Sequence, residues 1–165
     1  SQFLKITCFT RDVTSSQMWA YYAGGHQGYC VEYPLEAMAI ADLRARWLYP
    51  VIYSNDRFRL WPMFQISRRG TALIHWPVLT AIHKGIRWAH EQEWRIITPA
   101  DYNHNEIVMP WPSGIYLGNK IRLEDKQRLI SIVAELERKR GAPIPIYEMK
   151  ASETDYSLLP VKAMA

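Results

Sequence analysis

The stretch HEQEWRIITP, residues 90–99, predicts a strand that begins at a pair of carboxylates. Its second part combines aromatic and β-branched side chains, which is typical of a strand. Because side chains alternate between the two faces of a strand, Glu93 and Arg95 share one face with Ile97. Glu91 and Glu93 then lie together where the strand begins, near a sheet edge at which pockets commonly open.

These two carboxylates have two interpretations, and the sequence leaves both open. Close like charges raise the pKa of one carboxyl group, which suits acid/base chemistry or the stabilisation of a developing cation. Alternatively, Glu93 pairs with a nearby arginine and orders the strand, while Glu91 is solvated.

Length and composition predict one globular domain over residues 1–165. The chain is 48% apolar and 22% charged, which excludes a disordered polymer. Aromatic residues make up 13% of the chain, and such side chains fill cores, line pockets or stack on bases. The net charge of +4 is compatible with an anionic partner.

Cysteine usage and hydropathy predict a cytoplasmic protein without a membrane span. Cys8 and Cys30 lie in strand-like segments and are expected to be buried free thiols. The N-terminal segment lacks the pattern of a signal peptide, and no apolar run reaches membrane length. Neither a Cys/His cluster nor an HExxH motif is present, so we expect no metal site.

The pattern of apolar residues, turn residues and helix caps predicts an α+β fold. We expect a mixed, largely antiparallel sheet of about six or seven strands with three or four helices. The predicted strands are 3–10, 27–34, 50–56, 93–99, 114–121, 143–152 and 157–163, and the predicted helices are 16–24, 35–49, 73–89 and 122–141. On the third of these helices, Lys84, Trp88 and Glu91 fall on one face, which is typical of a solvated or ion-paired surface.

Two further segments carry candidate binding residues. Trp19 and Tyr22 lie three residues apart on the predicted helix 16–24, where core packing is the alternative to ligand stacking. His26 follows two glycines that permit a tight loop. Residues 57–69 interleave arginines with aromatic side chains, a composition that suits nucleic acid or a solvated loop.

Together these motifs resemble a bacterial family known as domain of unknown function 2971. The resemblance rests on ITCFTRD (6–12), MWAYYAGGHQGYCVEY (18–33), VIYSND (51–56), KGIRWAHEQEWRI (84–96) and IYLGNKI (115–121).

The layout is also similar, more distantly, to ADP-ribosyltransferases, which bind NAD in a cleft of a split mixed sheet. That similarity implies an NAD-consuming enzyme with a toxin or phage-defence role. It makes Glu93, with Glu91, the catalytic pair that stabilises an oxocarbenium-like ribose. Trp19 or Tyr22 would stack on the nicotinamide, and His26 and Arg95 would complete the cofactor site.

The alternative function is a noncatalytic module. Such a module would bind nucleic acid or a protein partner through its basic and aromatic surface.

Overall fold

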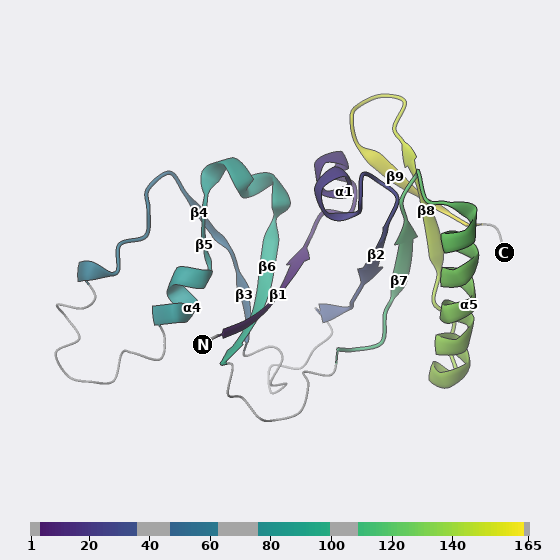
Figure 1. The fold of residues 1–165 in the computed structure, drawn as a ribbon, viewed down its shortest axis with the longest axis horizontal. Helices are drawn as coiled ribbons and strands as arrows, with labels where there is room; N and C mark the ends of the chain where they lie inside the picture. Colours follow the sequence, from purple (N-terminus) through teal and green to yellow (C-terminus); the bar gives the residue numbers. More distant parts are fainter. Residues whose placement is uncertain (1–3, 36–46, 63–75, 100–108, 164–165) are drawn as a thin grey trace. The chain divides into compact units, whose positions relative to one another are not determined.

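The computed structural model describes residues 4–35, 47–62, 76–99 and 109–163 (Figure 1). These residues form two compact units, each with its own sheet and buried core. Among the described residues, unit 1 contains 4–11, 47–62 and 76–99, and unit 2 contains 12–35 and 109–163. The expectation of a single domain stays a prediction.

Unit 1 is built on a three-stranded antiparallel sheet. Its strands are β1 (Leu4–Thr10), β6 (Glu93–Pro99) and β3 (Leu48–Pro50), in the order β1-β6-β3. The predicted strand 93–99 is therefore confirmed as β6, and it is the central strand. Ile96 and Ile97 are both buried, because a central strand is covered on both faces.

Unit 1 also contains a two-stranded parallel ribbon. It pairs β4 (Ile52–Ser54) with β5 (His83–Gly85), and β5 is flanked by helix α4 (Trp76–Ala81) and the 3-10 helix η2 (Ile86–Glu91). The prediction of one helix over 73–89 is wrong in its described part. Gly85 is extended, with φ −64° and ψ 142°, and pairing of β5 with β4 replaces helical hydrogen bonds.

Unit 2 is built on a four-stranded mixed sheet. Its strands, in spatial order, are β2 (Tyr29–Glu32), β7 (Gly114–Leu117), β8 (Ile146–Ala151) and β9 (Leu158–Lys162). Helix α5 (Leu123–Arg140) packs Val133 against Ile115 and Leu117 of β7. The helix ends at Gly141, which has φ 73° and serves as the predicted C-cap.

A second core cluster of unit 2 surrounds the short helix α1 (Ser16–Tyr22). Ser15 caps the helix by accepting a hydrogen bond from the Met18 amide. Trp19 is 4% exposed and packs with Met149 and Leu158. Its indole Nε1–H donates to the Val13 carbonyl at 2.7 Å, so the buried polar end is satisfied.

The α+β prediction with a mixed, largely antiparallel arrangement is confirmed. The described residues contain nine strands, two more than predicted, because β5 was not anticipated and because β3 forms at the end of the predicted helix 35–49, where the helix prediction is wrong, while β4 lies within the predicted strand 50–56. Most of the predicted helix 35–49 lies outside the described residues. Both cysteines are free, but the expectation that both are buried is wrong, since Cys8 is exposed on the outer strand β1 and Cys30 is half-buried.

Candidate functional site

The carboxylates Glu91 and Glu93 lie inside unit 1, where β6 begins. Glu91 is 1% exposed and Glu93 is 7% exposed. Gln92 between them is left-handed, with φ 44°, so the chain turns sharply from η2 into β6. The Thr10 hydroxyl donates to the Glu91 carbonyl at 2.7 Å and ties this turn to β1. The expectation of a solvated Glu91 is therefore wrong.

Two cations hold the carboxylates. Lys84 Nζ forms ion pairs with Oε2 of Glu91 and, at 3.0 Å, with Oε2 of Glu93. Arg95 binds Glu93 with two parallel hydrogen bonds, from Nε to Oε1 at 2.8 Å and from Nη2 to Oε2 at 2.9 Å. Its Nη1 donates to the Ala81 carbonyl, so the guanidinium also links β6 to the end of α4.

These contacts keep Glu93 ionised. Burial alone would raise the pKa of Glu93. The hydrogen bonds that its carboxylate accepts from Arg95, Cys8 and Lys84 outweigh burial and lower that pKa to about 2. The expected rise in the pKa of one carboxyl group does not occur at Glu93. Its hydrogen bonds with Arg95 and Lys84 favour the charged form of the carboxyl group.

The thiol of Cys8 responds in the opposite direction. Partial burial, followed by the hydrogen bond and the negative charge of Glu93, raises the pKa of Cys8 to about 11. Cys8 lies opposite Arg95 in the β1–β6 register, which places its sulfur beside the Glu93 carboxylate. A thiol in this state is protonated at neutral pH and acts as a hydrogen-bond donor, not as a nucleophile.

Two negative and two positive side chains therefore form one electrically neutral cluster, made of Lys84, Glu91, Glu93 and Arg95. Both Glu93 oxygens accept charge-assisted hydrogen bonds. This geometry can hold β6 against its neighbours. It is poorly suited to general acid catalysis, since a carboxyl group with a pKa near 2 carries no proton at neutral pH.

The surface next to the cluster is aromatic. Lys84 Nζ lies 5.1 Å from the centroid of the Trp88 ring, within the range of a cation–π contact. Trp88 stacks on His90 with centroids 6.1 Å apart and is 43% exposed. The predicted ion pair between Lys84 and Glu91 is confirmed. The two residues lie on strand β5 and on the 3-10 helix η2, however, and not on one helix.

The structure brings Glu91, Glu93 and Arg95 together, whereas Trp19, Tyr22 and His26 belong to unit 2. Trp19 is a core residue, which confirms the packing interpretation for it, while Tyr22 is 64% exposed. His26 lies in a loop with φ 72°. Their role as cofactor-binding residues stays a prediction, as does catalysis by Glu91 and Glu93.

The sequence missed Lys84 as the bridge between the two glutamates. The spacing of Glu93 and Arg95 in a strand predicted that they share a face. This local pattern was enough to anticipate their ion pair. Local spacing placed Lys84 beside Glu91, but its second contact, with Glu93, depends on β5 and η2 and has no local sequence pattern. Within the described residues, no group of three or more His, Cys, Asp or Glu side chains is arranged to hold a metal ion.

Comparison with known proteins adds one finding. The family model described as "Protein of unknown function (DUF2971)" matches residues 18–96. Over these residues the chain is similar to this family. The matched segment includes all of the candidate residues, from Trp19 to Arg95. Searches of curated proteins and of solved structures gave no match. No helix among the described residues is long and apolar enough to cross a membrane.

Proposed function

We propose that unit 1 binds single-stranded nucleic acid. The observation that carries this proposal is the imbalance of exposed charge on the described part of the unit. Its exposed acidic residue is Asp56, and its exposed basic residues are Lys5, Arg11, Arg57, Arg59 and Arg87. The two other carboxylates of the described part, Glu91 and Glu93, are buried and compensated by cations. A basic surface attracts a polyanion and steers its approach.

Topology brings several of these cations close to exposed aromatic rings. Strands β4 and β5 are parallel, with Ser54 opposite Gly85, so their carboxyl ends lie at the same edge (Figure 1). Residues 55–62 and 86–91 therefore leave this edge from neighbouring positions. The first segment carries Arg57 and Arg59, and the second carries Arg87.

Aromatic rings on the same two segments supply stacking surfaces. Trp61 is 70% exposed and Trp88 is 43% exposed. Phe58 stacks on the His83 ring with centroids 4.1 Å apart, which fixes the first segment against β5. Cations beside open aromatic faces are the combination that single-stranded nucleic acids require, since phosphates bind the cations and bases stack on the rings.

The NAD-consuming activity implied by the resemblance to ADP-ribosyltransferases is the second candidate. One observation favours it, namely that Glu93 is ionised at the first residue of a strand. Its charge is, however, already neutralised by Arg95 and Lys84, so little field remains to stabilise an oxocarbenium ion. The nucleic-acid proposal needs no carboxylate and is therefore the better fit.

Fluorescence anisotropy of a labelled 15-nucleotide oligo(dT) tests the proposal. If Arg57, Arg59 and Arg87 each contact a phosphate, raising the salt from about 50 to about 200 mM weakens binding by about 20-fold. Replacing both Arg57 and Arg59 by alanine should make the salt dependence shallower. The substitution Trp61→Ala should weaken binding by about 5- to 150-fold through the loss of base stacking.

The matched control is Lys139→Ala, which removes an exposed cation from the last turn of α5 in unit 2. It should leave the affinity within about twofold, because it lies outside the proposed surface. Absence of binding at low salt, or equal losses for the control and the arginine variants, would exclude the proposal. The NAD-consuming activity would instead be supported if the chain released nicotinamide from NAD, and if Glu93→Gln abolished this release while Trp61→Ala did not.

A further inference from the structure

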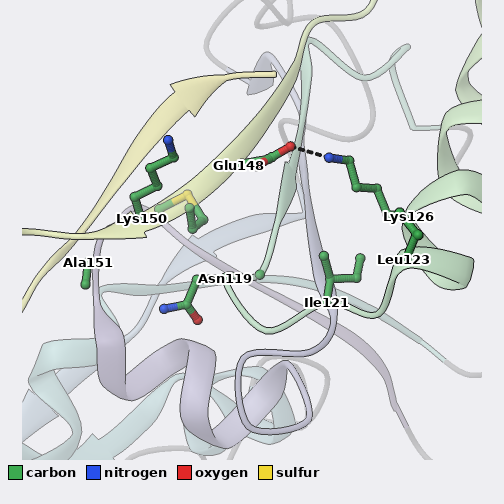
Figure 2. Close-up of a pocket in the computed structure, with 9 residues that line it drawn as sticks. Asn119, Ile121, Leu123, Lys126, Glu148, Lys150 and Ala151 are labelled. Atoms are coloured by element: carbon green, nitrogen blue, oxygen red, sulfur yellow. Dashed lines mark hydrogen bonds and ion pairs between the residues drawn. The ribbon is translucent and has the colours of Figure 1, made fainter. Parts of the chain in front are cut away.

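Unit 2 contains a hollow where β7 ends and β8 continues. β7 stops at Leu117, whereas β8 runs on to Ala151, three residues beyond the last paired position. After β7, the amides of Gly118 and Lys120 donate to the carbonyls of Gly28 and His26, and a hollow with a volume of about 490 Å³ lies between this segment and β8 (Figure 2). This volume falls within the range of small-ligand and peptide side-chain pockets.

The floor of the hollow is an open strand edge. The carbonyl of Ile146 and the amide of Ser152 bond to the β9 side, whereas the carbonyl of Pro145 bonds to β7. Backbone groups of successive residues point to opposite edges of a strand. The amide and carbonyl of Ala151 therefore face the side that β7 has left, where an added strand could pair with them.

The rim of the hollow is positively charged. Lys126 Nζ forms an ion pair with Glu148 Oε1, as the dashed line in Figure 2 marks. Lys150 also lines the hollow and is exposed, and among the described residues it takes part in no ion pair. The lining side chains thus carry a net charge of one positive unit, from Lys150.

Exposed apolar side chains flank the charged rim. In the β8–β9 register, Lys150 lies opposite Leu159, and Glu148 lies opposite Val161. Directly opposed residues project from the same face, so the exposed side chains of Leu159 and Val161 lie beside the rim. Leu123, at the first residue of α5, also lines the hollow and is 67% exposed.

We propose that this hollow binds an extended acidic peptide that adds to the open edge of β8. Main-chain hydrogen bonds to Ala151 supply affinity, as in other cases of strand addition. A carboxylate of the peptide pairs with Lys150, and its apolar side chains pack on Leu123 and Leu159. This binding site is independent of the nucleic-acid surface proposed for unit 1.

The test uses a fluorescein-labelled octapeptide in which glutamate and valine alternate, titrated against the full chain. We expect saturable binding that Lys150→Glu weakens by about tenfold, since the variant places like charges together. Ala151→Pro removes the amide that faces the hollow but no bond to β9, and it should abolish binding. The control Lys162→Glu makes the same charge change on the opposite face of the sheet and should alter affinity by less than about twofold.

Amide hydrogen exchange provides a second readout that does not depend on how the proline variant folds. Exchange of the Ala151 amide should slow when the peptide is bound to the wild-type chain. The proposal is overturned if the peptide fails to bind at about 1 mM, a concentration that corresponds to a very weak complex. It is also overturned if the two lysine variants weaken binding equally, or if octanoate occupies the hollow while the peptide does not.

Discussion

Replacing Glu93 by glutamine should remove a large part of the acid sensitivity of unit 1. The folded chain lowers the pKa of Glu93 from 4.5 to about 2, because burial is outweighed by hydrogen bonds from Arg95, Cys8 and Lys84. Such a difference corresponds to ~3 kcal/mol of folding free energy at neutral pH. Because the pKa is lowered on folding, this contribution is complete above pH ~5 and is lost as the pH falls towards ~2.

The measurement is urea unfolding of wild type and Glu93→Gln between about pH 7 and pH 2.5, followed by tryptophan fluorescence. At neutral pH the variant should be less stable by up to ~3 kcal/mol, or ~6–12 °C in melting temperature for a chain of this size. Near pH ~2.5 the unfolding free energies of the wild type and of Glu93→Gln should converge. The control Glu153→Gln removes an exposed carboxylate from the β8–β9 loop and should follow the wild type. Parallel curves for wild type and Glu93→Gln over the whole range would refute the ion-pair account.

Three further predictions concern packing and the thiol. Trp19→Ala empties a buried site and should lower the unfolding free energy by ~3–5 kcal/mol in a denaturant titration, whereas Trp19→Phe should cost less. Gly118→Ala should destabilise the chain, because a Cβ there overlaps a neighbouring backbone carbonyl, while Gly85→Ala meets nothing nearer than 4.0 Å and should melt close to the wild type. Cys8 should react with iodoacetamide at pH 8 about 100-fold more slowly than a thiol with an ordinary pKa, and Glu93→Gln should speed the reaction; equal rates in both proteins would contradict the role of Glu93.

Local patterns were sufficient wherever one element decides its own structure. The alternation in β6 predicted that Glu93 and Arg95 share a face, and the apolar stripe with Gly141 predicted α5 almost to the residue. Each of these predictions uses only the period of a strand or helix and its cap. Nothing distant in the chain is required.

The misses share one physical cause, which is pairing between segments far apart in the sequence. The segment around Gly85 has helical spacing, but hydrogen bonds to β4 make it a strand instead. The proximity of Glu91 and Glu93 was expected to raise the pKa of one of the two carboxyl groups, whereas that of Glu93 is lowered. The position of Lys84, set by that same strand pairing, helps to reverse the direction.

The neutral cluster also explains why the register of β6 is well defined. A slip of one residue would move Glu93 and Arg95 to the face that now carries Trp94 and Ile96. The Glu93 carboxylate would then lose its ion pair with Lys84, which would keep Glu91 as its acidic partner. Leaving a buried charge without its partner costs ~3–5 kcal/mol, more than a surface pair contributes. The two glutamates of HEQEWRIITP therefore favour one alignment of the central strand, and their burial leaves the exposed charge on the described part of unit 1 mainly basic.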